Sequence, residues 1–289
     1  MALEIRKLNP TIGAELSGVD LAEDITDPDA KAIHQALLDH KVIFFRDQDL
    51  SPERQLKLAS IFGELEDPHP IFPGVEGAEQ VTVIEHDANH PPQENVYHTD
   101  VTWREYPALG SVLHAIKVPE NGGDTIWVNL EAAYAHLSEP MQAMLTELSA
   151  WHSIEVFSNS VNYEKGSDPT QFAEILKMFP PQLHPVVRTH PETGNQGLFV
   201  NKTFTTKVEG MRLLESQHLL NMLYDIAELP EFQVRFQWTK GSIAIWDNRC
   251  THHYAVGDYM PNYRKMHRVT IKGDRPFYSK EKDRAQAAE

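Results

Sequence analysis

Two side chains that could bind a metal stand two positions apart in the segment Tyr97-His98-Thr99-Asp100. In an extended strand, residues i and i+2 point to the same face, so the His98 imidazole and the Asp100 carboxylate would converge. Such nitrogen and oxygen donors suit a divalent first-row metal. A third ligand would complete a two-histidine, one-carboxylate triad, which leaves open positions for chemistry at Fe(II). The same pair also occurs by chance as a surface hydrogen bond, so the metal interpretation depends on a third ligand elsewhere.

The third ligand is expected after the segment Trp246-Asp247-Asn248-Arg249, where His252 and His253 follow one another. Neighbouring residues of a strand face opposite sides, so only one of these histidines can face the first two ligands. The spacing leaves open which of the two it is.

Arg264 and Arg268 indicate a second kind of chemistry, the binding of anions. A strand is expected over 266–271, and if it begins at Arg264, both arginines project from one face, about 13 Å apart. Val269 and Ile271 would then occupy the other face. A buried guanidinium is costly unless an anion pairs with it, and its planar fork matches carboxylate and sulfonate oxygens. The pattern predicts a metal beside two separate anion sites, the alternative being two surface arginines.

Composition limits the possible partners. The chain has 289 residues, with 42 acidic and 26 basic side chains and a formal net charge of −16. This balance argues against a nucleic-acid partner, and an anionic substrate would need local arginines to overcome the overall negative potential. No apolar run approaches the length of a membrane span, and the first residues do not have the pattern of a signal peptide. The single cysteine, Cys250, excludes an internal disulfide and is expected to pack as a small buried side chain. We therefore expect a cytoplasmic protein without a membrane partner.

The elements that must position these residues are many short strands and a few clustered helices. Alternating or continuous apolar patterns predict strands over 3–8, 42–45, 80–84, 111–118, 126–128, 183–189, 198–201, 232–238, 242–246 and 266–271. Helical periodicity and capping residues predict helices over 27–40, 51–62, 129–137, 139–149 and 211–228. This mainly β pattern with flanking helices fits a β-barrel or a jelly roll.

Three segments stand apart from this pattern. Residues 64–96 are rich in Pro, Gly, Asp, Glu and Asn, and a long loop beside the candidate metal ligands suits a lid or a substrate wall. Residues 158–181 are expected to be an insertion between strands. Residues 278–289 form a charged C-terminal tail that is expected to fray.

The sequence resembles the taurine dioxygenase family of Fe(II)/2-oxoglutarate-dependent oxygenases over essentially the whole chain. The matching segments are, in order, Tyr97-His98-Thr99-Asp100, Gly122-Gly123-Asp124-Thr125, His184-Pro185-Val186-Val187-Arg188-Thr189-His190-Pro191, Trp246-Asp247-Asn248-Arg249, His253-Tyr254-Ala255, Asp258-Tyr259 and Met266-His267-Arg268. The resemblance implies a double-stranded β-helix, the jelly roll, with residues 1–277 as a single dioxygenase domain. It also implies a homo-oligomer, a dimer or tetramer.

The resemblance assigns the metal and cosubstrate residues. It implies that Fe(II) is bound by His98, Asp100 and His253, and so favours His253 over its neighbour as the third ligand. Arg264 and Thr125 would bind the distal carboxylate of 2-oxoglutarate. With O2 as the second cosubstrate, the implied reaction hydroxylates a substrate while 2-oxoglutarate becomes succinate and CO2.

The substrate implied by the resemblance is a small sulfonate. Arg268 and His69 would bind its anionic group, and taurine would be converted to sulfite and aminoacetaldehyde. At two positions that line the family's substrate pocket, this chain has Phe72 where a tyrosine is expected and Glu94 where an asparagine is expected. If Glu94 faces the pocket it would pair with the taurine ammonium group; the alternative is that it faces solvent. Another sulfonate, an alkyl sulfate or an aryloxyalkanoate remains possible.

Two other classes of protein could use the same residues. A zinc hydrolase would have the same three ligands but no clear use for Arg264. A non-catalytic jelly-roll binding protein would have no reason to combine a ligand triad with a second anion site. Oxygen-dependent release of succinate distinguishes the dioxygenase from both.

Overall fold

The computed structural model describes residues 3–68, 73–92, 95–155 and 176–280. Three of the predicted substrate residues, His69, Phe72 and Glu94, lie outside the described residues, as does most of the predicted insertion at 158–181. Among the residues that are described, no helix has both the length and the apolar character needed to span a membrane.

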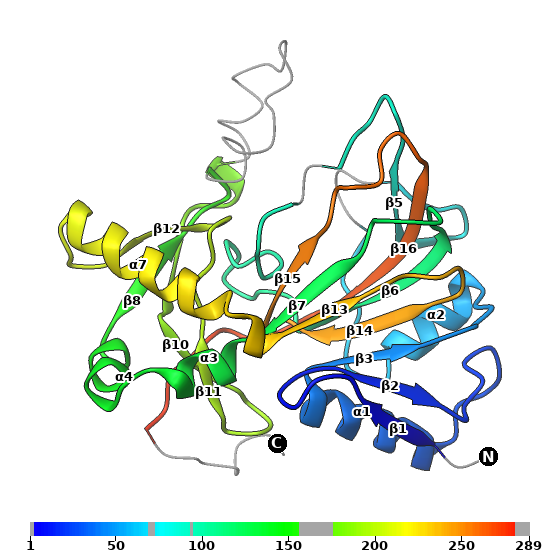
Figure 1. The fold of residues 1–289 in the computed structure, drawn as a ribbon, viewed down its shortest axis with the longest axis horizontal. Coiled ribbons are helices and arrows are strands. Elements are labelled where there is room, and N and C mark those ends of the chain that lie inside the picture. Colours follow the sequence, from blue (N-terminus) through cyan, green and yellow to red (C-terminus); the bar gives the residue numbers. More distant parts are fainter. Residues whose placement is uncertain (1–2, 69–72, 93–94, 156–175, 281–289) are drawn as a thin grey trace.

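An eight-stranded sheet forms the centre of the fold (Figure 1). In spatial order its strands are β1 (Glu4–Lys7), β2 (Ala14–Ser17), β3 (Val42–Phe45), β14 (Ile243–Asp247), β6 (Gly110–Lys117), β16 (Arg264–Ile271), β5 (Ala78–His86) and β4 (Gly74–Val75). Strands β2 and β3 run parallel, whereas β3, β14, β6, β16 and β5 are joined by antiparallel pairs.

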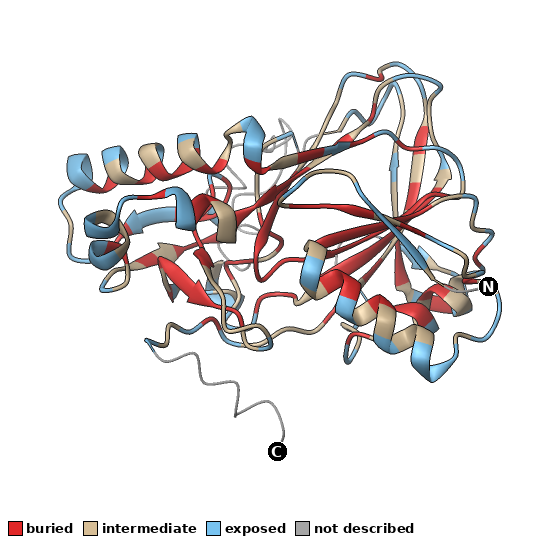
Figure 2. Cartoon of the chain, turned by 60° about the horizontal axis from the view of Figure 1, so that its bottom comes forward, coloured by how far each residue is buried: buried red, intermediate tan, exposed pale blue. Residues whose placement is uncertain are grey.

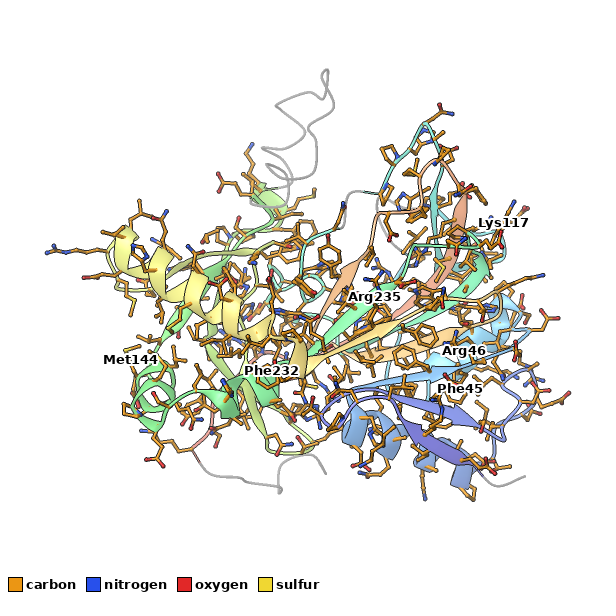
Figure 3. The ribbon with its side chains drawn as sticks, viewed as in Figure 1. Phe45, Arg46, Lys117, Met144, Phe232 and Arg235 are labelled. Carbon is orange, nitrogen blue, oxygen red and sulfur yellow. The ribbon has the colours of Figure 1, made fainter. Side chains whose placement is uncertain are left out.

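A smaller antiparallel sheet faces the large one. It contains β13 (Gln233–Phe236), β7 (Thr125–Asn129) and β15 (Thr251–Ala255). The side chains between the two sheets form one apolar cluster, in which the rings of Phe44 and Phe236 stack at 4.0 Å. Arg46, labelled in Figure 3, covers this stack with its guanidinium 3.9 Å from the Phe236 ring centroid. Two facing sheets with a shared core form the sandwich of a jelly roll.

Two helices pack on the other side of the large sheet. Helix α1 (Asp27–His40) begins at Thr26, whose hydroxyl accepts a hydrogen bond from the Asp29 amide, and α2 (Pro52–Ala59) begins at Ser51 in the same way. Ile33 and Leu58 are among the helix residues buried in the core with the sheet. Figure 2 shows the consequence, with buried residues along the strands and exposed residues along the outer sides of the helices.

A second lobe lies beside the sandwich (Figure 1) and has its own apolar core. It contains α3 (Leu130–His136), α4 (Glu139–Leu145), β8 (Ser149–His152), β9 (Gln182–Pro185), β10 (Val187–Thr189), β11 (Gln196–Leu198), β12 (Thr205–Val208), α7 (Leu213–Ala227) and the 3-10 turn η1 (Pro230–Phe232). Its strands form a three-stranded sheet, β12-β8-β9, and the β10-β11 hairpin.

The structure corrects four of the predicted elements. The strand expected over 198–201 is instead Gln196–Leu198. The strand expected over 80–84 is longer, Ala78–His86, because it pairs with β16 along its whole second half, so the described part of residues 64–96 is less loop-like than the composition of this segment indicates. The strand expected over 183–189 is divided between two sheets at Val186, whose amide donates to Leu148 instead of to a strand partner. Helix α4 ends at Leu145, because residues from Ser149 onward pair with β9.

Candidate metal centre and active site

The two predicted histidine ligands lie opposite one another. The His98 amide donates to the His253 carbonyl at 3.0 Å, and the His253 amide donates to the His98 carbonyl at 2.8 Å. Residues paired in this way carry their side chains on the same face, and the two imidazole centroids are 4.3 Å apart. The prediction of an extended strand through Asp100 is wrong, because His98 forms only this isolated bridge and the chain turns at Asp100. The side chains nevertheless converge.

Three donor atoms surround one space. Asp100 Oδ1 lies 3.7 Å from His98 Nε2 and 3.8 Å from His253 Nε2. These distances are too long for hydrogen bonds, and all three donor atoms lie within 4.8 Å of one another. The Nδ1 atom of His98 donates to the Val96 carbonyl at 2.8 Å, which leaves the Nε2 lone pair facing the shared space. Two imidazole nitrogens and a carboxylate oxygen therefore fit Fe(II).

The protonation states also suit metal binding. Burial lowers the pKa of His253 to about 3, assisted by the positive potential of neighbouring groups. Burial acts to raise the pKa of Asp100, but the favourable potential of His253 and Arg268 outweighs it, so this pKa lies below its ordinary value. At neutral pH the carboxylate is charged and the His253 imidazole is neutral, which are the forms that bind metals. His252 does not join this cluster. Its ring is buried elsewhere, within reach of the Val200 backbone.

Strand β16 places the two predicted anion-binding arginines as the spacing indicates. It begins at Arg264, and Met266, between the arginines, lies in the core between the sheets. Val269 and Ile271 lie in the core with the helices, on the opposite face. Arg268 reaches the metal cluster, with Nη1 3.7 Å from Asp100 Oδ1. The arrangement confirms that both arginines point into the sandwich.

Arg264 and Thr125 occupy the same buried corner. The Thr125 hydroxyl accepts a hydrogen bond from the Trp238 indole at 3.0 Å, so its own hydrogen can be donated to a ligand. The Arg264 guanidinium lies 5.9 Å from the ring centroids of both Trp238 and Tyr259. Gly123, with φ +72°, passes close by, because a Cβ there would be 3.4 Å from the Arg264 Cδ. In the sequence, this glycine was noted only as part of the segment Gly122-Gly123-Asp124-Thr125, which carries the family resemblance.

A cavity of about 250 Å³ opens beside the metal cluster. It is lined by Glu66, Asp67, Pro68, Gln80, Thr82, Asp100, Val101, Arg104, Arg268 and Thr270. Arg268 is thus the one predicted substrate residue that the described part of the chain places here. Sequence reasoning missed Arg104, whose Nη1 donates to Glu66 at 3.3 Å. Its position in the turn after Asp100 was the available signal.

The turn after Asp100 is fixed by buried polar groups of the second lobe. Val101 has φ +46°, a strained value for a β-branched residue. The next residue, Thr102, anchors the turn: its hydroxyl accepts from Asn201 at 3.0 Å, and its carbonyl accepts from His184 at 2.9 Å. His152 lies 2.9 Å from the same hydroxyl. The second lobe therefore helps to hold a metal ligand and part of the cavity wall.

A jelly-roll sandwich with this triad inside it is typical of non-haem iron oxygenases. The sequence model described as the taurine catabolism dioxygenase TauD, TfdA family matches residues 4–270. The chain therefore belongs to this family of Fe(II)- and 2-oxoglutarate-dependent dioxygenases, which confirms the resemblance read from the sequence.

Several known proteins are similar to the chain. An alkylsulfatase from Acinetobacter baylyi is 39% identical over 281 residues, covering 94% of this chain and 86% of the relative. An alpha-ketoglutarate-dependent sulfate ester dioxygenase from Pseudomonas putida is 37% identical and covers 96% and 91%. The crystal structure of a taurine dioxygenase from Burkholderia xenovorans superimposes with a TM-score of 0.81 at 36% identity, covering 95% of this chain and 90% of that one. The likeness confirms the predicted fold.

Proposed function

We propose that this enzyme oxidises small organosulfur anions and that alkyl sulfate esters are its preferred substrates. The observation that carries the proposal is the position of Arg268, which lines the cavity and lies 3.7 Å from Asp100 Oδ1. An anion paired with this guanidinium would be held beside the metal cluster. The choice of a sulfate ester over a sulfonate rests on two relatives, an alkylsulfatase and a sulfate ester dioxygenase.

In this proposal, different residues bind the metal and the cosubstrate. His98, Asp100 and His253 would bind Fe(II), and the bound ion would supply O2 activation and couple substrate oxidation to conversion of 2-oxoglutarate into succinate and CO2. Arg264 pairs with the distal carboxylate of 2-oxoglutarate through its planar fork, and Thr125 donates its hydroxyl hydrogen to the same group. The apolar rings around Arg264 exclude water and so strengthen the pairing.

Arg268 orients the substrate. Its guanidinium pairs with the sulfate oxygens, so that the carbon bearing the ester oxygen faces the metal. Hydroxylation of that carbon gives an unstable hydroxy sulfate ester, whose C–O bond to sulfate breaks as the hydroxyl loses its proton. The products are an aldehyde and hydrogen sulfate, together with succinate and CO2.

Taurine is the second candidate, supported by the family description and by the Burkholderia xenovorans structure. The same hydroxylation next to sulfur would release sulfite and aminoacetaldehyde. Recognition of the ammonium group by Glu94 would favour this substrate over an alkanesulfonate of similar length.

A substrate panel tests the proposal. The purified enzyme is incubated under air with Fe(II), 2-oxoglutarate and ascorbate, and with hexyl sulfate, taurine, butanesulfonate or an aryloxyacetate. We expect the highest succinate release with hexyl sulfate, matched by equimolar sulfate, and none without oxygen. Higher turnover of taurine with release of sulfite would establish the second candidate. Sulfate release without oxygen would identify a hydrolase and contradict the proposed chemistry.

A further inference from the structure

Asn248 contacts a metal ligand from behind. It lies in the turn between β14 and β15, is 1% exposed, and its Nδ2 donates to Asp100 Oδ2 at 3.4 Å. The turn itself is anchored, because the Asn248 amide donates to the Leu109 carbonyl at 2.8 Å. A buried amide with a fixed backbone can hold its partner in one orientation.

The orientation of the Asn248 amide is determined by Trp246. The Trp246 indole nitrogen lies 2.9 Å from Asn248 Oδ1. An indole N–H can only donate, so the atom that faces it must be the amide oxygen. The amide NH2 group therefore faces Asp100. Trp246 cannot readily turn away, because it is 2% exposed within the core between the sheets.

These contacts divide the two oxygens of Asp100 between different partners. Oδ1 faces His98 Nε2, His253 Nε2 and the Arg268 guanidinium at 3.7 to 3.8 Å. Oδ2 faces Asn248. A carboxylate that binds through one oxygen takes one position on an octahedral metal, whereas one that binds through both takes two. Keeping Oδ2 away from the metal leaves a position that the cosubstrate or O2 would otherwise lose.

We propose that Asn248 is a positioning residue that holds Asp100 as a one-oxygen ligand and thereby keeps the metal accessible to 2-oxoglutarate. The proposal rests on the metal site of the proposed function. Removing the amide donor frees Oδ2 to turn toward the metal, where it competes with chelation by 2-oxoglutarate. The effect is specific to cosubstrate affinity, since all three protein ligands remain.

The test measures binding without turnover. Manganese(II) replaces iron as a probe that is inert to oxygen. Its affinity for wild type, Asn248→Ala and Asn248→Asp is measured by calorimetry, followed by the affinity of 2-oxoglutarate for each manganese-loaded protein. We expect manganese affinity to change by less than tenfold, because all three ligands remain, and 2-oxoglutarate affinity to fall about 10- to 100-fold, similar in size to the losses of metal affinity or activity that changes around metal ligands cause. The electron paramagnetic resonance spectrum of bound manganese should also differ between wild type and the Asn248 variants.

Asn129 provides the matched control. It is 4% exposed, donates to the Thr11 carbonyl at 2.7 Å and caps α3, so Asn129→Ala and Asn129→Asp impose the same chemical changes away from the metal. These variants should lose thermal stability without losing 2-oxoglutarate affinity. Trp246→Phe keeps Asn248 and an aromatic ring beside His253, but removes the donor that orients Asn248. It should leave manganese affinity within tenfold and weaken 2-oxoglutarate binding in the same direction as the Asn248 variants, by less. If the Asn248 variants do not fold, the 2-oxoglutarate affinity of Trp246→Phe tests the positioning role of Asn248.

Two results have different meanings. If the Asn248 variants, or Trp246→Phe in their place, keep 2-oxoglutarate affinity within twofold of wild type, Asn248 has no positioning role. If wild type binds no manganese, or binds it equally well after His98→Ala, the metal site of the proposed function fails instead.

Discussion

Single residues of the metal cluster are oriented in different ways. A side-chain hydrogen bond to the Val96 carbonyl orients the His98 ring. His253 Nδ1 has no hydrogen-bond partner among the described residues. The His253 ring is held instead by packing against Trp246, with the ring centroids 5.1 Å apart, and by the backbone bridge to His98. The position of His253 therefore depends on β15. Its neighbour on the same strand, His252, is buried outside the metal cluster.

The adjacent histidines should respond differently to substitution. His253→Ala is expected to abolish manganese binding and turnover, because two remaining ligands hold the metal poorly. His252→Ala should keep the turnover of the folded enzyme but lower the free energy of unfolding by about 1–3 kcal/mol, because it empties a buried site. Calorimetry with manganese and thermal unfolding of both variants separate the two effects. A His252→Ala enzyme that cannot bind metal would refute the assignment.

The two arginines should affect different ligands. Arg264→Ala is expected to raise the KM for 2-oxoglutarate, since losing one partner of a buried charge pair costs about 2–5 kcal/mol. Arg268→Ala should instead raise the KM for the organosulfur substrate. Steady-state kinetics with each ligand varied in turn measure both. Equal changes in both constants for both variants would contradict two separate anion sites.

Between elements, a chain of polar groups, part-exposed at His34 and Glu192 and buried from Arg249 onward, joins the sandwich to the second lobe. His34 on α1 contacts Glu192 in the β10-β11 turn at 2.8 Å, and Glu192 contacts Arg249 at 2.7 Å. Arg249 pairs with Asp247 at 2.6 Å, and Asp247 contacts His190 at 3.0 Å. Although Cys250 lies near the last two residues, the paired Asp247 makes this group an ion-pair network and not a second metal site. Cys250 itself is 3% exposed, which confirms the predicted packing role.

This network should make stability depend on pH in a particular way. The hydrogen bond with His34 lowers the pKa of Glu192 from 4.5 to about 2. The ionised Glu192 therefore stabilises the folded state. This stabilisation is complete above the pKa of Glu192 in the unfolded chain, about 4.5, and is lost as the pH falls from there toward 2. The same bond raises the pKa of His34, whose contribution is complete below its ordinary value and is lost as the pH rises through the raised one.

Glu192→Gln tests this coupling. Between pH 5 and 6 it should lower the free energy of unfolding by about 1–3 kcal/mol relative to wild type, and the difference should shrink below pH 4. Glu147→Gln, which removes an exposed partner of Lys280, is the control and should change stability little. Denaturant unfolding across this pH range measures both variants. A Glu192→Gln deficit that stays constant down to pH 3 would show that the charge plays no part.

The presence of most strands and the common face of the two arginines could be predicted because both follow from local periodicity, whereas the order of the strands in the sheets depends on contacts between distant segments. Strand β5 was underestimated because its ends, including Glu79 and Glu85, are polar and continue no apolar pattern, and only pairing with β4 and β16 shows that they belong to the strand. Asn248 was not identified because its role depends on a contact with Asp100, far away in the sequence. The predicted roles of His69, Phe72 and Glu94 stay predictions, since these residues lie outside the described part.

We propose that residues 1–277 act as one catalytic domain, because the second lobe anchors the turn after Asp100. The homo-oligomer implied by the family stays a prediction. The net charge of −16 gives the protein an overall negative potential, which repels anionic ligands. The buried arginines must therefore attract these ligands at short range.

The overall charge predicts an unusual dependence on salt. Raising ionic strength from about 10 mM to about 100 mM shortens the Debye length from about 30 Å to about 10 Å and screens the repulsion of anions. We expect kcat/KM for 2-oxoglutarate to rise over this range. Manganese(II) affinity, measured in the same buffers, should fall, because attraction of the cation is screened too. If kcat/KM for 2-oxoglutarate falls instead, attraction by the local arginines, and not repulsion by the net charge, governs the approach of 2-oxoglutarate to the site.

The paired backbone bonds between His98 and His253 have a consequence for how the metal is acquired. They join two of the three ligands during folding, so the loss of chain entropy needed to bring these ligands together is part of folding and not of metal binding. Unlike a zinc finger, which is unfolded without its ion, this protein should reach its native state first and bind metal afterwards. Hydrogen exchange can detect this order of events: the amides of both histidines should exchange slowly in the metal-free protein, and loading with manganese should slow them only slightly further.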